Sequence, residues 1–200
     1  MLRSFVAFAL LCLAAPAFGQ TPAAPTAAPV RVVLQTGQGN IVIAVEASRA
    51  PVTSRNFLRY VDQRRLDGIA FYRAMTVGPD AGLIQAGVRD PRRLFPPIAH
   101  EPTSRTGLSH TDAAVAMARA EPGTARSDFY IVVGDLTSLD ARAGDPGYAV
   151  FGRVVEGMDV VRRILASPRS PTEGADIGMQ GQILSPQVRI VTARRAPATP

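Results

Sequence analysis

The chain has 200 residues, 46% of them hydrophobic and 19% charged, which is typical of a globular domain with a core of its own. Its formal net charge is +6, and every cation is an arginine because the sequence contains no lysine. The arginines are scattered, without the aromatic-interleaved stripe of a nucleic-acid-binding surface. One cysteine, Cys12, excludes an intrachain disulfide, and His100 and His110 have no paired ligand spacing, so we expect loop histidines, no metal and no cofactor.

Residues 1–19 have the three parts of a secretory signal peptide. Arg3 supplies the positive charge, residues 5–15 form an apolar stretch too short to span a bilayer, and Ala17-Phe18-Gly19 places small residues before a cleavage site. The alternative is a buried N-terminal helix. The signal predicts an exported, periplasmic protein with no membrane contact once the signal is removed.

The signal is followed by a linker and then by the folded part of the chain. Residues 20–29 are rich in proline, alanine and threonine and predict a flexible linker. We expect one domain over residues 30–195 and a disordered tail over 196–200.

Eight strands and two helices are predicted within this domain. Pro51 opens the first helix, whose apolar stripe ends before Asp67-Gly68, and Gly157–Leu165 forms the second. Because the helices do not alternate with the strands, a doubly wound sheet is excluded and an antiparallel barrel or sandwich with plugged ends is favoured. The predicted strands are 30–34, 40–45, two within 70–87, 113–118, 128–133, 148–155 and 187–192.

Arg73 stands out within the first strand of the 70–87 pair. Period-two alternation places it on one face with Ile69 and Phe71. A guanidinium in apolar surroundings is costly unless its donors are used, and it can present positive charge to a bound amide without losing its proton. The alternative is a surface arginine beside a barrel mouth.

Six ordered sequence blocks between about Val30 and Thr192 resemble those of the cyclophilins. The blocks begin with a helix start and a short strand motif and end with a long strand-to-helix segment. They are Ala50-Pro51 with Asn56-Phe57, Phe71-Tyr72-Arg73, Gln85-Ala86-Gly87, Met117-Ala118, Ser127-Asp128-Phe129-Tyr130-Ile131, and 150–158.

The resemblance implies a mainly β fold, a closed eight-stranded antiparallel barrel capped by two α-helices. It also implies peptidyl-prolyl cis–trans isomerase activity that assists the folding of exported proteins, and a monomeric state. The partners would be proline-containing segments of unfolded or partly folded proteins, bound in a surface groove. Rotation about an X–Pro bond crosses a barrier of about 18–20 kcal/mol without breaking a covalent bond, so no nucleophile is required.

By the same resemblance, Arg73 is the catalytic residue, and its guanidinium would donate to the prolyl nitrogen in the twisted state. Gln85 would hold a substrate backbone group and steady the arginine. Ala118 and Arg119 would offer backbone groups to the residues that flank the proline. The proline pocket would be lined by Leu83, Tyr130, Leu139 and Tyr148.

Five positions depart from the family pattern, among them Tyr130 in place of a phenylalanine and Arg119 in place of an asparagine. Gly82 and Ser138 stand where the family has aromatic residues, and Asp128 replaces a glutamine at the substrate site. Each lost aromatic wall removes burial of roughly 1.5–3 kcal/mol, and Asp128 is expected to pair with Arg73 or Arg119. We therefore expect weaker or altered substrate binding. The alternative function is a catalytically weak or inactive peptide-binding or chaperone module.

Overall fold

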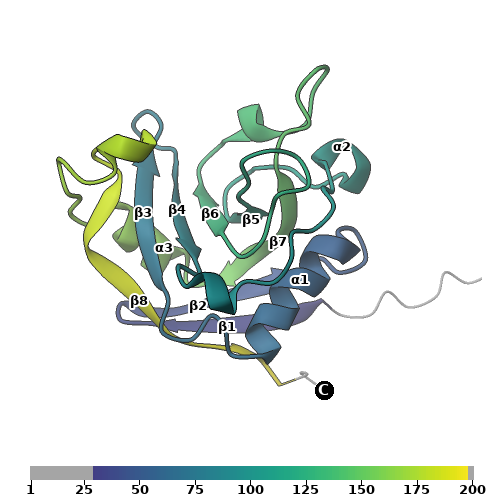
Figure 1. The fold of residues 1–200 in the computed structure, drawn as a ribbon, viewed down its shortest axis with the longest axis horizontal. Coiled ribbons are helices and arrows are strands. Elements are labelled where there is room, and N and C mark those ends of the chain that lie inside the picture. Colours follow the sequence, from purple (N-terminus) through teal and green to yellow (C-terminus); the bar gives the residue numbers. More distant parts are fainter. Residues whose placement is uncertain (1–28, 198–200) are drawn as a thin grey trace, which may run out of the picture.

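The computed structural model describes residues 29–197, so the predicted signal, residues 20–28 of the linker and the last three residues lie outside the described part. Eight antiparallel strands close into a barrel in the order β1-β2-β7-β5-β6-β4-β3-β8 (Figure 1), which confirms the predicted fold class. The strands are β1 (Val30–Thr36), β2 (Gly39–Val45), β3 (Ala70–Thr76), β4 (Gly82–Gly87), β5 (Ala114–Met117), β6 (Phe129–Val133), β7 (Ala149–Glu156) and β8 (Ile183–Arg195).

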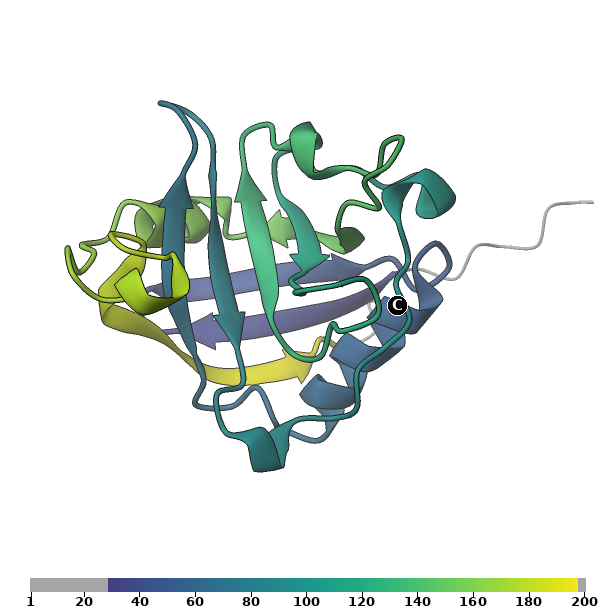
Figure 2. The same ribbon diagram turned by 45° about the horizontal axis from the view of Figure 1, so that its top comes forward.

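Two helices cover opposite open ends of the barrel (Figures 1 and 2). Helix α1 (Pro51–Asp62) follows the end of β2, and α3 (Met158–Leu165) begins beside the start of the same strand. Both are amphipathic, and each turns its buried face toward the barrel. A one-turn helix, α2 (Thr103–Thr106), and three short 3-10 turns (Pro91–Arg93, Thr137–Leu139 and Ala175–Ile177) lie in the connections.

Phenylalanine rings fill the barrel interior. Phe57 of α1 reaches the strands with ring centroids 5.4 Å from Phe129 and 5.0 Å from Phe151, and Phe71 stacks edge-on against Phe129 at 6.1 Å. All four rings are at most 2% exposed. Any peptide must therefore bind outside the barrel.

The long segment between β4 and β5 is irregular, as predicted, apart from the 3-10 turn Pro91–Arg93 and the one-turn α2, and it is tied to α1. Ala50 provides no side-chain cap for this helix, and the buried carboxylate of Glu101 accepts hydrogen bonds from Val52 N (3.1 Å), Thr53 N (2.7 Å) and Thr53 Oγ1 (2.7 Å) instead. A carboxylate at a helix N-terminus accepts hydrogen bonds from the free N–H groups, and its negative charge interacts favourably with the positive end of the helix dipole.

A second attachment of this segment centres on Phe95. Its N–H donates to the Tyr60 hydroxyl at 2.8 Å, and its ring lies between the guanidinium groups of Arg59 (3.6 Å) and Arg65 (3.9 Å). The segment is thus held on α1 by polar and cation–π contacts.

A β-bulge in β3 changes the predicted faces of that strand. The register against β4 shifts between Phe71 and Arg73, so that Tyr72 is an extra residue. Phe71 and Ala74 join the core, whereas Tyr72 and Arg73 lie outside it. The expectation that Arg73 shares a face with Phe71 is therefore wrong, because a bulge interrupts period-two alternation.

The C-terminal strand is longer than predicted. It begins at Ile183 rather than Gln187 and continues to Arg195, and the N–H of Ala196 still donates to the Arg31 carbonyl at 2.8 Å. Among residues 29–197, no helix has the length and apolar character needed to cross a membrane.

Candidate active site

Arg73 is half-buried on the outer wall of the barrel, and neighbouring side chains hold its guanidinium. Nε donates to Gln182 Oε1 at 2.8 Å, Nη1 donates to Gln85 Oε1 at 2.9 Å, and Nη2 lies 3.3 Å from Met75 Sδ. Burial lowers the pKa of Arg73, but an arginine keeps its proton in proteins. Of the five N–H groups of a guanidinium, two are left without an acceptor among the described residues.

The orientation of Gln85 follows from its two polar neighbours. Its carbonyl oxygen accepts from Arg73, so its amide nitrogen faces the other way and lies 3.4 Å from Asp128 Oδ1. A carboxylate can only accept, and a guanidinium can only donate, so the amide has one satisfied orientation. Gln85 thereby couples Arg73 to Asp128.

The partner of Asp128 differs from the two that the sequence suggests. The carboxylate pairs with Arg89 at 2.7 Å and accepts from the Tyr72 hydroxyl at 2.9 Å, and it contacts neither Arg73 nor Arg119. Burial raises the pKa of Tyr72, so its hydroxyl stays a donor. The β-bulge contributes to this arrangement, because it turns Tyr72 out of the core and its hydroxyl reaches Asp128.

Four of the predicted substrate-binding residues line one pocket of about 300 Å³. Gln85 lies at one side, Ala118 and Arg119 at another, and Asp128 closes it together with Arg89 and Tyr72. The Arg89 guanidinium stacks on the Tyr72 ring at 3.7 Å. Arg73 does not line this pocket itself and is joined to it through Gln85.

The predicted proline-pocket residues form one apolar patch beside this pocket. Leu83 and Tyr130 are its buried base, and Leu139 and Tyr148 are half-buried and pack against it, as does Met75. Because Met75 also contacts Arg73, the guanidinium stands between the apolar patch and the polar pocket. The structure thus brings all nine predicted site residues onto one outer wall.

The backbone of the strand exit offers fewer groups than predicted. The N–H of Ala118 donates to the Asp128 carbonyl at 2.8 Å and is already used. Among the described residues, no hydrogen bond engages the N–H or C=O of Arg119. The Arg119 side chain donates to the Gly147 carbonyl and lies 4.8 Å from the centre of the Tyr148 ring.

Gly82 and Ser138 depart from the family pattern in different ways. Ser138 is exposed, in agreement with an open pocket edge. At Gly82 a Cβ would collide with the Met75 carbonyl oxygen and lie 3.1 Å from the Leu165 side chain. The interpretation of Gly82 as a simple lost wall is therefore wrong, because this backbone leaves no room for a side chain.

Three contributors to the site carry no local sequence signal. Gln182 lies in the loop before β8, 109 residues from the arginine it contacts. Arg89 follows a strand end in an arginine-rich chain. His110 lies in a loop, as predicted, but its side chain is completely buried, which the sequence does not indicate.

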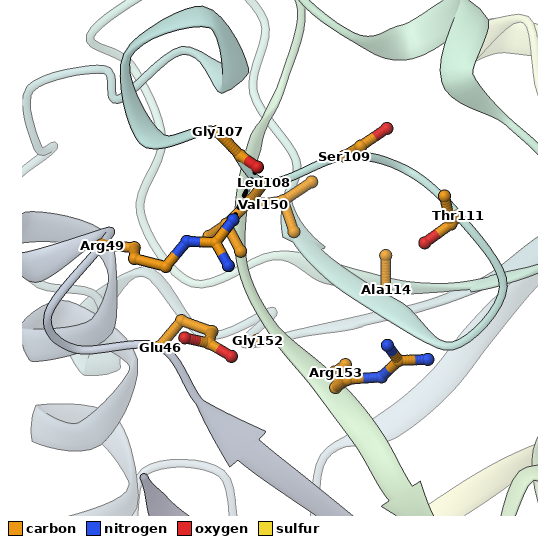
Figure 3. Close-up of a pocket in the computed structure, with 10 residues that line it drawn as sticks. All are labelled: Glu46, Arg49, Gly107, Leu108, Ser109, Thr111, Ala114, Val150, Gly152 and Arg153. Carbon is orange, nitrogen blue, oxygen red and sulfur yellow. Dashed lines mark hydrogen bonds between the residues drawn. The ribbon is translucent and has the colours of Figure 1, made fainter. Parts of the chain in front are cut away.

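A second, polar pocket of about 180 Å³ lies outside this site, between the start of α1 and the segment that leads into β5 (Figure 3). Glu46 and Arg49 approach it from one side and Arg153 from β7, and the Arg49 guanidinium donates to the Gly107 carbonyl at 2.6 Å. None of the predicted site residues lines it.

Known proteins are similar to this chain over most of its length. The family model for cyclophilin-type peptidyl-prolyl cis-trans isomerases matches residues 31–194. A peptidyl-prolyl cis-trans isomerase of Acinetobacter baylyi is 33% identical over 165 residues (82% of this chain, 84% of that protein). Peptidyl-prolyl cis-trans isomerase A of Dickeya dadantii is 31% identical over 195 residues (97% and 98%).

The fold is likewise shared with solved structures. A crystal structure of a Cryptosporidium parvum cyclophilin-type peptidyl-prolyl cis-trans isomerase superimposes with a TM-score of 0.65 at 17% identity. The match covers 86% of this chain and 99% of that one. At this identity the likeness supports the barrel architecture alone.

Proposed function

Because the chain belongs to the cyclophilin-type peptidyl-prolyl cis-trans isomerase family, we propose that it accelerates rotation about X–Pro peptide bonds, with Arg73 as the catalytic residue. The observation that carries this proposal is the position of the guanidinium. It stands between an apolar patch suited to a proline ring and a polar pocket suited to the flanking chain, and it retains two donors.

The chemistry requires an interaction that grows during rotation. Resonance keeps the X–Pro amide planar, and the prolyl nitrogen gains a lone pair only when the bond is twisted. A charged N–H donor placed at that nitrogen stabilises the twisted state more than either planar isomer, which lowers the barrier. Gln85 and Gln182 hold the guanidinium in place, so the guanidinium does not have to reorient when the substrate twists.

The substrates in this proposal are proline-containing segments of unfolded or partly folded proteins. The patch of Leu83, Tyr130, Leu139 and Tyr148 would receive the ring, and the free backbone groups of Arg119 would pair with the adjoining residue. An extended chain can cross the outer barrel wall, whereas the filled interior cannot admit it.

The proposed location is the periplasm, where the protein would assist the folding of exported chains as a monomer. Support comes from the signal-like pattern in residues 1–19, which lie outside the described residues. Expression of the full chain in a Gram-negative host, followed by fractionation and N-terminal sequencing, tests this. Mature protein that begins near Gln20 in the periplasmic fraction is expected, and an uncleaved cytoplasmic chain would contradict the location.

The catalytic proposal is tested by a proline-isomerisation assay on the tetrapeptide Ala-Ala-Pro-Phe. Arg73→Ala should lower kcat/KM by about 10²-fold or more, the usual loss for a donor aimed at a transition state. Arg55→Ala is the matched control, because Arg55 is exposed on α1 and its substitution also removes one positive charge. If the wild-type protein does not raise the rate above the uncatalysed one, the isomerase proposal is wrong and the alternative, a peptide-binding module, remains.

A further inference from the structure

A series of hydrogen bonds centred on the buried side chain of His110 lies directly behind the apolar patch. His110 is 0% exposed, and its two ring nitrogens contact Asp140 Oδ1 (2.6 Å from Nδ1) and the Tyr130 hydroxyl (2.9 Å from Nε2). The imidazole and the Tyr130 ring are stacked, with centroids 5.9 Å apart and planes inclined by 16°. The proposed rotation of an amide does not by itself require these contacts.

The proton positions follow from the partners. The Asp140 carboxylate also accepts from the backbone N–H of His110 at 3.1 Å and from the Ser109 hydroxyl, so it acts only as an acceptor. Nδ1 must then carry a hydrogen. In the neutral imidazole Nε2 is an acceptor, and the Tyr130 hydroxyl donates to it. Burial lowers the pKa of His110 and raises that of Tyr130, which agrees with this assignment.

These hydrogen bonds join a patch residue on a strand to a patch residue on a turn. Tyr130 lies on β6, whereas Asp140 directly follows Leu139 in the turn that carries this leucine. The Leu139 carbonyl in turn accepts from Tyr148 N at 3.1 Å. The spacing between the patch residues on the strand and those on the turn therefore depends on His110.

We propose that His110 is a positioning residue that, as a neutral imidazole between Asp140 and Tyr130, sets the affinity of the patch for the proline ring. This inference rests on the proposed function. His110 does not touch Arg73, so its loss should act on peptide binding and leave the rotation step nearly unchanged.

Protonation of the imidazole breaks the pattern. Nε2–H would donate to the Tyr130 oxygen, and the hydroxyl hydrogen would lose its acceptor in a residue that is 3% exposed. A buried donor without a partner is costly. The charged and titratable groups around these hydrogen bonds are Asp140 on the turn, Tyr148 and Arg119 beside Tyr130, and Glu46, Arg49 and Arg153 in the neighbouring pocket (Figure 3).

The test compares Tyr130→Phe and His110→Asn with Tyr60→Phe. Tyr60 is the matched control, because its hydroxyl is also buried and hydrogen-bonded but lies on α1. Binding of Ala-Ala-Pro-Phe is followed by NMR titration, and kcat and KM by the isomerisation assay. Tyr130→Phe and His110→Asn should raise Kd and KM about three- to ten-fold at unchanged kcat, and Tyr60→Phe should change neither.

Two further readouts separate positioning from general stability. The double variant Tyr130→Phe/His110→Asn should bind better than His110→Asn alone, because the phenyl ring has no hydroxyl to satisfy. In the wild type, ring ¹⁵N spectra should show His110 as the neutral Nδ1–H form. The Kd for the peptide should rise once the pH is below the ordinary imidazole pKa of about 6.5.

Wild-type affinity in Tyr130→Phe, or equal losses in Tyr60→Phe, would overturn the proposal. The titration and the ring spectra do not depend on turnover. An inactive wild type that binds the peptide with the predicted pattern would therefore contradict the isomerase function and leave the role of His110 intact.

Discussion

The carboxylate of Asp128 occupies the space that a methyl group on Gly87 would need. A Cβ built on Gly87 would lie 2.6 Å from Asp128 Oδ1 and closer still to the other carboxylate atoms. The absence of a side chain at Gly87 thus lets Asp128 reach Tyr72, Gln85 and Arg89 together. Asp128 is the element that joins the pocket wall to the residue that holds Arg73.

Gly87→Ala should displace this carboxylate without straining the backbone. The Asp128 contacts would loosen, the Gln85 amide would lose its partner, and we expect kcat/KM to fall by about three- to thirty-fold, the loss of one or two ordinary hydrogen bonds. Gly37→Ala is the control, because a Cβ there has nothing within 4 Å. Unchanged kinetics in Gly87→Ala would show that Asp128 has no part in the site.

Gln182 is predicted to be a positioning residue for Arg73. Gln182→Ala removes the acceptor for Arg73 Nε, and we expect kcat to fall about three- to ten-fold while KM changes little, because peptide contacts lie elsewhere. Steady-state isomerisation kinetics measure both constants. Gln180→Ala serves as the control on the same loop, since its exposed side chain contacts only the Pro171 carbonyl. A higher KM at unchanged kcat would argue against this role.

Glu101→Ala should destabilise the fold through α1. It leaves Val52 N and the two Thr53 donors without an acceptor in a buried position, for which about 2–4 kcal/mol is expected. Glu101→Gln keeps an acceptor oxygen and should lose less. Urea unfolding at neutral pH gives both values, and equal stability in the alanine variant would refute the capping role.

The Asp67–Arg194 pair should contribute to acid sensitivity. Hydrogen bonds of 2.7 and 2.8 Å from Arg194 hold the pKa of Asp67 below its usual value. The folded state therefore binds this proton less readily than the unfolded chain, so the stabilisation is present above about pH 4 and is lost as the pH falls further.

Asp67→Asn removes this dependence. Urea unfolding between pH 7 and pH 3 should show a variant that is less stable at neutral pH and loses less on acidification than the wild type. Asp176→Asn changes an exposed aspartate that makes no ion pair among residues 29–197, so its slope should match the wild type. Parallel slopes for Asp67→Asn and the wild type would contradict the assignment.

Local patterns predicted most of the barrel. Short runs of apolar, β-branched or aromatic residues mark all eight strands, and Pro51 marks the start of α1, because burial and backbone restriction act over a few residues. The extra length of β8 was missed, since Ser185 and Pro186 look like part of a loop although the strand includes them. Pairing with β3, which lies far away in the chain, provides the order there.

The site could be predicted only in part. The family blocks supplied Arg73 and Gln85, but the bulge at Tyr72 has no sequence signature and determines which carboxylate partner is within reach. The contacts of Gln182, Arg89 and His110 depend on packing between segments that are distant in sequence. Such contacts arise from the closed barrel, and no local pattern encodes them.

The closed ring of strands has a consequence for the proposed binding of unfolded chains. Each of the eight strands is hydrogen-bonded on both sides, so the sheet presents no unpaired edge. Unfolded polypeptides readily add themselves as extra strands to open sheets, and that process leads to aggregation. A closed barrel can bind such a segment through side chains and the few free backbone groups of Arg119, and it can release the segment again because no exposed strand edge allows continuous pairing.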